Sequence, residues 1–585
     1  MIRTAETYDV IVVGSGGAGL RAAIGAAEKG AKTLVLGRGK INRSGATLLA
    51  GANISADVAC DGASLARLGI SDRNKGDTKE AWFADLVREG FYLNNQKLLE
   101  LFVETAADRV GELMDWGMQI RGMEGDREIS VFGSDILDAL YRRAKALGAA
   151  FLEDTLFCDL VTEGKTVCGV VCLDLLSGEL AFYPAKAVVL ATGGAHNLFP
   201  ENSGSTDLCG EGPAAALRAG AQLIDMEMIS FCPTVITSPL MYKGNILPYI
   251  FFSTGYGQLL NKYGKTFTHR YLSPHVEQLA LDTEWNKMLL SYAIQSEINA
   301  GRANLHGGVY FFLDGREDLL DELYSDLPPL KSGIYADIMK IFTAGHGVTV
   351  KPSAHYFEGG IRVNERMETA VSGLFAAGEC TGGMFGANRV SAATTEMLVE
   401  GARAGESAGL YACPAAVCSP SRDALDSLEE ELRRPLGRSA GERPSDAVHI
   451  LRDIVGGSLT VLREAGRLEA ASAKLADFCA DTLPGLRCES GDLAYNREWW
   501  EYLQLRSMVV TAGAILKSAA ARKESRGVHV RSDYLFTDDQ SYLKNTVVDD
   551  PALHVHFEDA VQTRMRPGGQ TLPYTAYIEK VIDEL

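Results

Sequence analysis

The sequence has no long apolar run and no group of closely spaced cysteines. No stretch of 18 or more apolar residues occurs, so a membrane-spanning helix is not expected. The 11 cysteines are scattered, without a C-x-x-C pair or a ferredoxin-like spacing, and no haem, iron–sulfur or other metal site is evident in this chain. An odd number of cysteines without a signal peptide is typical of a reducing compartment. We therefore expect a cytoplasmic protein, either alone or in a complex at the inner face of a membrane.

Positive charge is also scarce. The chain carries 57 lysines and arginines against 76 aspartates and glutamates, which gives a formal net charge of −19. Nucleic acids and anionic membrane surfaces attract proteins of the opposite sign, so we expect neither as a partner. The length of 585 residues exceeds what one hydrophobic core supports, so about two to four domains are expected.

What the sequence does contain is a glycine-rich turn between a strand and a helix. Residues 10–13 are a run of β-branched residues, as a buried parallel strand requires. Gly14, Gly16 and Gly19 then form Gly-x-Gly-x-x-Gly: the first permits the tight turn, the second lets the backbone approach a pyrophosphate, and the third lets the helix pack on the strand. An alanine-rich helix at residues 18–29 directs its N-terminus at the phosphates. The stretch predicts dinucleotide binding.

The end of the next strand distinguishes between two cofactors. A second strand, at residues 33–36, follows at the spacing of a βαβ unit. In NAD-binding units an acidic residue at this point holds a ribose hydroxyl group. Here the position is Gly37, followed by Arg38. The sequence therefore favours FAD, which extends along more of the chain, over NAD.

Two later stretches fit the same cofactor. Residues 41–57 are small and rich in hydroxyl groups, and they are suited to lining a flat ring at close backbone approach. A plain loop of glycine and serine explains that composition equally well. Residues 187–194 form a buried strand that ends in Ala-Thr-Gly-Gly, a pattern that recurs in flavoproteins with two dinucleotide-binding motifs.

Changes in composition divide the chain into three parts. An aromatic-rich segment with long polar helices interrupts the first domain, and a linker rich in Ala, Pro and Ser precedes a helical region at residues 447–521, interpreted as a three-helix bundle. We predict an FAD-binding domain of residues 1–236 and 345–410, a capping domain of residues 237–344 and a helical C-terminal domain with a tail at residues 411–585.

Seven motifs lie in the order and at the spacing of one known family. They are Gly14-Ser-Gly-Gly-Ala-Gly19, Ala191-Thr-Gly-Gly194, Phe231-Cys-Pro-Thr234, His355-Tyr-Phe-Glu-Gly-Gly360, Gly378-Glu379, Gly386-Ala-Asn-Arg389 and Glu524-Ser-Arg-Gly527. The set resembles the fumarate reductase/succinate dehydrogenase flavoprotein-subunit family, which includes L-aspartate oxidase and to which the α subunit of adenylylsulfate reductase is related. The resemblance runs nearly end to end. It implies an α/β fold with a split Rossmann-like FAD-binding domain, an inserted α+β capping domain that moves, and a C-terminal helical domain.

The resemblance also implies which residues contact FAD. In many family members a histidine at the position of Gly45 attaches FAD covalently, so FAD is expected to bind here without a covalent link. His355 and Arg389 are counted among the flavin contacts as well as among the catalytic residues. The other implied contacts, that of Phe157 being through its backbone, are Gly14, Ser15, Gly16, Gly17, Ala18, Gly37, Arg38, Ser44, Gly45, Ala46, Thr47, Gly51, Phe157, Ala191, Thr192, Gly193, Glu211, Gly378, Glu379, Thr394 and Thr395.

The family reduces or forms an activated C=C bond next to carboxylates, with hydride given or taken at N5 of FAD. By resemblance, His355 and Arg389 clamp one substrate carboxylate. Arginine grips a carboxylate bidentately, and both groups stabilise the charge that develops as hydride arrives. The resemblance therefore implies an FAD-dependent oxidoreductase that interconverts a 2-enoate and the corresponding saturated acid.

Several positions depart from the family pattern. The second carboxylate-binding histidine falls at Cys232, its threonine partner falls near Tyr249, and the proton-donating arginine falls near Lys287. An unpaired buried carboxylate is costly, so fumarate is a poor fit, and a substrate with one carboxylate and an apolar remainder fits better. Lys287 is the first candidate for the proton donor, and Tyr249 and Tyr256 are the next.

Two further classes of function stay open at this point. One is sulfur or C–N chemistry on the same fold, as in adenylylsulfate reductase or aspartate oxidase. The other is a non-catalytic subunit that only passes electrons through its flavin. Because the chain has no evident second redox centre, we expect a separate iron–sulfur subunit to exchange electrons with it.

Overall fold

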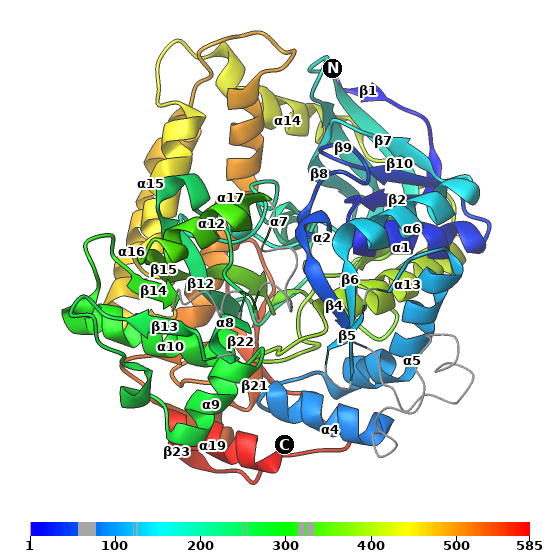
Figure 1. Ribbon diagram of the computed structural model, residues 1–585. Coiled ribbons are helices and arrows are strands. Elements are labelled where there is room, and N and C mark those ends of the chain that lie inside the picture. Colours follow the sequence, from blue (N-terminus) through cyan, green and yellow to red (C-terminus); the bar gives the residue numbers. More distant parts are fainter. Residues whose placement is uncertain are drawn as a thin grey trace.

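An eight-stranded sheet carries the glycine-rich turn (Figure 1). The computed structural model describes residues 2–55, 78–120, 122–124, 127–248, 250–253, 255–313, 321, 323, 331 and 333–585. Six strands follow the order β7–β3–β2–β10–β9–β8, and β1 and β17 also pair with β10. Their bounds are β1 (Arg3–Thr4), β2 (Tyr8–Val13), β3 (Thr33–Leu36), β7 (Ala150–Leu152), β8 (Thr155–Glu163), β9 (Thr166–Asp174), β10 (Leu180–Leu190) and β17 (Leu374–Ala376).

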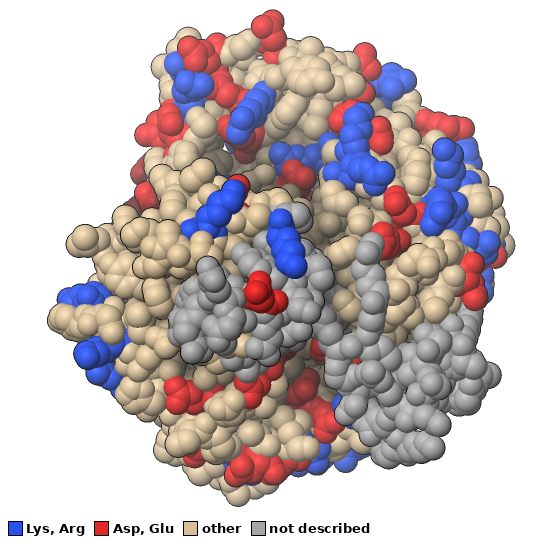
Figure 2. Space-filling model, in the orientation of Figure 1, with Lys and Arg blue, Asp and Glu red and all other residues tan. Residues whose placement is uncertain are grey.

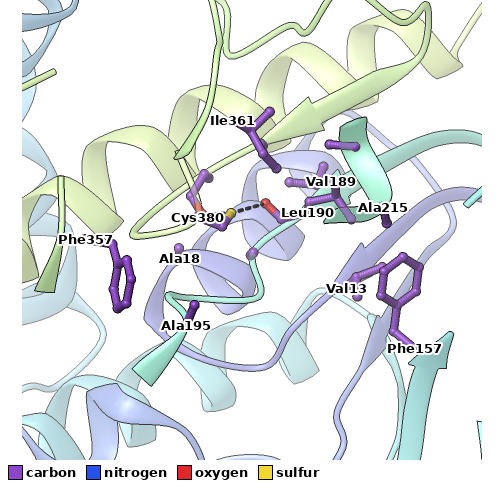
Figure 3. Packing of buried hydrophobic residues seen from close by; sticks show 14 of the residues in the cluster. Val13, Ala18, Phe157, Val189, Leu190, Ala195, Ala215, Phe357, Ile361 and Cys380 are labelled. Carbon is purple, nitrogen blue, oxygen red and sulfur yellow. Dashed lines mark hydrogen bonds between the residues drawn. The ribbon is translucent and has the colours of Figure 1, made fainter. Parts of the chain in front are cut away.

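The sheet changes from parallel to antiparallel pairing at β10. Strands β7, β3, β2 and β10 pair in parallel, as a βαβ unit requires, and β10, β9 and β8 form an antiparallel meander. Val10, Ile11 and Val12 have no exposed surface, because parallel strands are covered on both faces. Figure 3 shows the end of this core, with Val13 beside Phe157 and with Val189 and Leu190 next to each other at the end of β10.

Two helices pack closely enough against each other to require glycine at the contact. They are α1 (Gly17–Glu28) and α13 (Ala393–Ala412). A Cβ atom at Gly405 would lie 2.0 Å from the carbonyl oxygen of Ala22, and one at Gly25 would lie 2.9 Å from the amide nitrogen of Glu406. The contact joins the first glycine motif to the Arg389 region, although these segments are far apart in the sequence. The other helices of this part are α2 (Ala46–Leu49), α4 (Lys79–Glu89), α5 (Gln96–Asp115), α6 (Gly133–Ala146) and α7 (Glu211–Arg218).

The segment predicted as a cap contributes two strands, β13 and β14, to a second sheet and much of a second buried apolar cluster. The sheet order is β12 (Ile229–Ser238), β15 (Val348–Phe357), β14 (Val309–Leu313), β13 (Gly257–Leu260), all antiparallel. Phe251, Phe311 and Phe342 pack together inside it. Strands β12 and β15 of this sheet lie in the segments predicted to flank the insertion, and the boundaries of the insertion stay a prediction. The helices are α8 (Ile250–Ser253), α9 (Pro274–Asp282), α10 (Asn286–Glu297) and α12 (Gly333–Thr343).

The C-terminal part begins with helices, three of which contact one another as the predicted bundle requires. These are α15 (Pro444–Gly456), α16 (Ala465–Asp477) and α17 (Arg497–Ala521), preceded by α14 (Arg422–Arg433). The tail is part of the folded structure near the first domain. Its strands β21 (Lys544–Val548) and β22 (Val555–Asp559) form one sheet with β11 (Leu223–Ile224) and β16 (Gly360–Ile361). The remaining elements of the three smaller sheets and the tail are β4 (Gly51–Ser55), β5 (Gly122–Glu124), β6 (Glu128–Phe132), β18 (Leu462–Arg463), β19 (Val530–Arg531), β20 (Phe536–Asp538), α18 (Asp539–Tyr542), β23 (Thr571–Pro573) and α19 (Tyr574–Glu584).

A buried ionic network holds the tail against this sheet. Arg522 and Glu227 form an ion pair of 2.6 Å, and Arg526 pairs with Glu524 at 2.8 Å and with Asp539 at 3.0 Å, all with side chains that have no exposed surface. Breaking one such buried pair strands a charge away from water, at a cost of about 3–5 kcal/mol. The motif Glu524-Ser-Arg-Gly527 therefore has a structural role in this network.

The molecular surface carries both acidic and basic side chains. On the face drawn in Figure 2, acidic and basic side chains are interspersed over the described part of the molecule. Within the described ranges no helix is both long enough and apolar enough to span a bilayer. A disulfide, which the sequence did not predict, joins Cys168 in β9 to Cys418 in the segment after α13.

Candidate active site

The glycine-rich turn has the close contacts that its sequence predicts. Gly14 has φ +114°, and a Cβ atom there would lie 2.1 Å from the carbonyl oxygen of Ala191. A Cβ at Gly19 would lie 1.9 Å from the carbonyl oxygen of Gly14. A Cβ at Gly16, by contrast, would meet only the Thr47 hydroxyl, at 3.6 Å. The turn is thus closed toward the sheet and open at Gly16 and the start of α1, where a helix N-terminus attracts phosphate.

The hydroxyl-rich loop lies against this turn. The amide of Gly17 donates a hydrogen bond to Thr47 Oγ1 at 3.1 Å, so the loop at residues 44–47 is brought to the start of α1. Gly45 has φ +86°, a conformation that favours glycine, and a Cβ there would meet nothing within 4 Å. Ser44 lies in the same loop, Ala46 begins α2, and Gly51 begins β4. The structure therefore brings together two stretches that sequence reasoning assigned to one cofactor.

Arg38, just after β3, lies close enough to Glu211 for its charge to act on that carboxyl group. Burial raises the pKa of Glu211, and the positive charge of Arg38 opposes that rise, so the two groups are electrostatic neighbours. Glu211, the first residue of α7, accepts a hydrogen bond from the amide of Cys209 at 3.2 Å. Arg38 lies 3.3 Å from Asp207, measured from Nη1 to Oδ1. Phe157, on β8, is buried, as shown in Figure 3.

Glu379 ties three segments of the site together. Its carboxylate accepts hydrogen bonds from the amides of Gly194 at 3.2 Å and of Phe357 at 3.3 Å. His196 Nε2 lies 3.6 Å from the same carboxylate and 2.7 Å from the carbonyl oxygen of His355. The loop after β10, which contains Ala191, Thr192 and Gly193, is thereby joined to the loop after β17, which contains Gly378.

His355 is held as a neutral imidazole. Its Nδ1 lies 2.7 Å from the hydroxyl oxygen of Ser203. Burial is the main cause that lowers the pKa of His355 well below its usual value, and the charges of Lys287, His196 and Arg389 lower it further. Lys287 and Arg389 therefore lie close enough to His355 for their positive charges to lower its pKa. The predicted clamp pair, His355 and Arg389, therefore shares one site.

Arg389 is buried and held on three sides. Its Nη1 donates to the carbonyl oxygen of Ser391 at 3.2 Å, and its guanidinium lies over the Tyr356 ring, 3.5 Å from the ring centroid. Nε of Arg389 lies 3.5 Å from Oε2 of Glu358, without a hydrogen bond between them. A guanidinium so restrained loses little conformational freedom when it binds a planar carboxylate.

Two buried carboxyl groups of the site were missed by sequence reasoning. Glu358 accepts a hydrogen bond from Ser230 at 2.8 Å, and burial raises its pKa. Glu396 accepts a hydrogen bond from the hydroxyl of Tyr356, and burial raises the pKa of Glu396 to about 7. Glu358 stands inside the quoted motif His355–Gly360, and an acidic residue in that apolar and glycine-rich stretch is the signal that was available. Thr394 and Thr395 are buried beside Glu396 at the start of α13.

The candidates for the proton donor lie in different surroundings. Lys287, in the first turn of α10, forms an ion pair with Glu284, and its charge also acts on Cys232 and Glu358. Burial raises the pKa of the Cys232 thiol to about 11, so it is neutral at physiological pH. Tyr256 lies between α8 and β13. Tyr249 lies outside the described residues.

The turn, the loop at residues 44–47 and the buried arginine together define a class of protein, the FAD-binding flavoproteins. Residues 9–395 match the family model described as an FAD binding domain, and residues 449–572 match that described as fumarate reductase flavoprotein C-term. The chain belongs to the fumarate reductase/succinate dehydrogenase flavoprotein-subunit family. It is an FAD-dependent oxidoreductase.

Named relatives extend along nearly the whole chain. It is 30% identical to one of the subunits of the fumarate reductase (CoM/CoB) of Methanothermobacter marburgensis, over 90% of this chain and 94% of the relative. It is also 30% identical to a fumarate reductase flavoprotein subunit of Mycobacterium tuberculosis, over 96% of this chain and 98% of the relative. The predicted family is therefore confirmed.

Solved structures confirm the predicted fold class. "Mycobacterium smegmatis Sdh1 in complex with UQ1" superimposes with a TM-score of 0.83 at 28% identity, over 97% of this chain and 96% of that one. The adenylylsulfate reductase of Archaeoglobus fulgidus superimposes with a TM-score of 0.76 at 19% identity, over 96% of this chain and 97% of that one. The second likeness shows a shared fold alone.

Proposed function

We propose that this flavoprotein transfers a hydride between FAD and a monocarboxylic substrate, across a C–C bond next to the carboxylate. FAD supplies a two-electron acceptor or donor at its N5 atom when bound. The observation that carries the proposal is that Arg389 is buried near a neutral His355, with its guanidinium restrained by Ser391, Tyr356 and Glu358. Arg389 binds the substrate carboxylate, and His355, fixed by Ser203, orients it and polarises the adjoining bond.

The charges around Arg389 support one carboxylate rather than two. Among the residues that the structure describes, Arg389 and Lys287 are the cations placed near His355, and each already has a carboxylate neighbour, Glu358 and Glu284 respectively. Cys232, at the position of the family's second carboxylate-binding histidine, is a neutral thiol. A second substrate carboxylate would lack a cation here, and burying an unpaired carboxylate is strongly unfavourable. A substrate whose far end is apolar avoids that cost.

FAD is proposed to bind without a covalent link. Gly45, at the position of the histidine that attaches FAD in many members, has no side chain to form the bond. The open face at Gly16 and the start of α1 fits a pyrophosphate, and the loop at residues 44–47, which Thr47 joins to Gly17, fits the flat ring. The other cofactor contacts implied by the resemblance are proposed on the same basis.

The electron partner is proposed to be a separate iron–sulfur subunit. Both relatives named above are themselves subunits, which means that they are parts of assemblies. In the described part of this chain the buried cysteines are dispersed over β8, β9, β12 and other elements, and they form no cluster of four. A flavin that has taken up two electrons needs an electron acceptor before it can react again, and iron–sulfur clusters accept electrons one at a time.

A half-reaction screen tests the proposal. Holoenzyme is reduced chemically without oxygen and mixed with monocarboxylic 2-enoates that have short, long and aromatic tails, with fumarate as the comparison. We expect the oxidised-flavin absorbance to recover with monocarboxylic enoates at least about tenfold faster than with fumarate. Burying one unpaired charge raises the free energy of the bound fumarate by more than about 1.4 kcal/mol, and this amount corresponds to a tenfold change in rate. Faster recovery with fumarate overturns the substrate class. Recovery with one-electron acceptors alone indicates an electron-transfer role, and peroxide formation under air indicates an oxidase.

A further inference from the structure

A cluster of two histidines and one aspartate lies on the C-terminal hairpin, apart from the flavin site. His554 directly precedes β22, and His556 lies within it, so their side chains share one face of the strand. Asp549 directly follows β21, one position beyond the paired residues Val548 and Val555. The ligand atoms of the three side chains all lie within 4.8 Å of one another. The hairpin lies in the lower middle of Figure 1.

We propose that Asp549, His554 and His556 form a binding site for a divalent transition metal of the Zn²⁺ class. Nδ1 of His554 lies 3.7 Å from Oδ1 of Asp549, and Nδ1 of His556 lies 3.6 Å from Oδ2. Bond lengths of about 2.0–2.1 Å to zinc in tetrahedral geometry place ligand atoms about 3.4 Å apart, so little movement is needed. Two imidazole nitrogens and one carboxylate select transition metals over Mg²⁺ or Ca²⁺, which prefer oxygen ligands.

The placement of the His556 ring between two carboxylates is the observation that points to a cation. Nε2 of His556 lies 3.1 Å from Oε1 of Glu558, at hydrogen-bond distance, so Nε2 carries the proton and donates it. In the neutral ring the Nδ1 lone pair then faces the Asp549 carboxylate at 3.6 Å, too far for a hydrogen bond. Two electron-rich atoms that face each other repel unless a positive charge, either a metal ion or a second ring proton, lies between them, and the titration below distinguishes the two.

The surroundings resemble the outer shell of known metal sites. A metal-binding histidine usually donates its other N–H to a carboxylate, which fixes the ring and raises its basicity. Glu558 has this role for His556, and Arg362 in turn holds Glu558 through an ion pair of 2.6 Å. Arg362 also donates to Gln222 at 3.0 Å, so this chain of contacts ends on the β11 side of the sheet.

The hairpin loop is fixed well enough to hold a metal. The amide of Leu553 donates to the carbonyl oxygen of Asp550 at 2.9 Å, and the amide of His554 donates to the Asp550 side chain at 3.3 Å. The Leu553 side chain packs against α17 at Gly513, where a Cβ would lie 2.4 Å from it. A bound metal would add a further restraint on this loop and would keep one coordination position open to water or a partner's side chain.

Competitive titration of the full-length holoprotein with Zn²⁺ tests the site. After removal of trace metal, a fluorescent zinc indicator competes with the protein. We expect about one equivalent of Zn²⁺ to bind, and the His554→Ala/His556→Ala double variant to lose it. Glu558→Gln is expected to keep the stoichiometry and to weaken binding by about 10–100-fold, the usual effect of an outer-shell carboxylate.

Matched controls separate this site from other ligands. His449, an exposed residue on α15, gives the control His449→Ala, which is expected to bind Zn²⁺ like the wild type. The exposed thiols of Cys413 and Cys479 are replaced by serine in every variant, since thiolates bind zinc. Unchanged stoichiometry in the double variant, or no wild-type binding tighter than the indicator, overturns the proposal. His554→Ala alone, at a side chain that is 68% exposed, gives a second variant that is expected to fold normally and to lose affinity.

Discussion

Nε of Arg389 lies 3.5 Å from Oε2 of Glu358, and the side chains of both residues are buried. A substrate carboxylate that binds Arg389 therefore meets a site in which one carboxylate is already present. Glu358 offsets part of the arginine charge and limits how much negative charge the site accepts.

Replacement of Glu358 by glutamine is expected to change selectivity between substrates. Gln has nearly the same shape, but it removes the negative charge beside Arg389. We expect the KM for dicarboxylates such as fumarate or succinate to fall about tenfold relative to monocarboxylates, because one repulsive neighbour is lost. Steady-state kinetics with both substrate classes measure the ratio. An unchanged ratio means that Glu358 only positions Arg389; Ser230→Ala, which removes the hydrogen bond to Glu358 but keeps its charge, is the matched control.

Arg389→Lys is expected to lower kcat/KM by about two orders of magnitude. Lysine keeps the charge but loses the planar fork and the stacking on Tyr356. The rate constant for flavin reoxidation by substrate and the KM are measured in the same variant. Activity within about threefold of the wild type would contradict the role of Arg389. Arg403→Lys, on the partly exposed part of α13, is the control, since it too replaces an arginine but lies elsewhere on the helix.

Acid precipitation is expected to release all the flavin into the supernatant. Gly45 offers no side chain for covalent attachment, so only noncovalent contacts hold FAD. The absorbance of the supernatant and of the washed pellet is compared after denaturation. Flavin absorbance that remains with the pellet would show a covalent link elsewhere.

Lys287→Met is expected to lower turnover by about 10²–10⁴-fold while flavin and substrate still bind, if Lys287 donates the proton. The ion pair with Glu284 supports a charged, oriented ammonium group in the first turn of α10. One limb of the pH–rate profile is expected to disappear with the side chain. Near-normal turnover rejects Lys287 and leaves Tyr256 and Tyr249 as the candidates to test next.

Glu396 is expected to make the folded state less stable as pH rises. Its folded pKa of about 7 exceeds its ordinary value of 4.5, so between these values the native state binds more protons than the unfolded state. Stability therefore falls as the pH rises through this window, by an amount on the order of 1–3 kcal/mol. Chemical unfolding of the wild type and of Glu396→Gln at pH values from about 5 to about 8 gives the difference. The same pH dependence in both proteins would contradict this role of the carboxyl group.

Local patterns predicted much of the fold, because neighbours in the sequence determine them. Gly14, Gly16 and Gly19 act within one turn, so their spacing was enough to predict the phosphate site. The family and the fold class followed from motifs of that kind and are confirmed.

The site contacts that sequence reasoning missed join distant segments. Glu358 contacts Ser230 across 128 positions and lies near Arg389 on another segment, so its place in a motif could suggest a role but could not reveal these partners. Burial is the main cause that raises the pKa values of Glu358 and Glu396, and burial is a property of the folded chain. The ion pair between Lys287 and Glu284 is the exception, because a spacing of three residues at a helix start was visible in the sequence.

The pairing of β21 with β11 has a consequence for biosynthesis. Asn545 donates a hydrogen bond to Asp225 across 320 positions, and β11 lies in the same sheet as β16, which follows the His355 motif. At about 5–20 residues per second, the ribosome needs roughly 15 to 60 seconds to make the intervening chain. The sheet next to the proposed catalytic residues is therefore completed only late in translation. Until then, chaperones have an incomplete edge to protect, and stable loading of the cofactor is expected to come after synthesis.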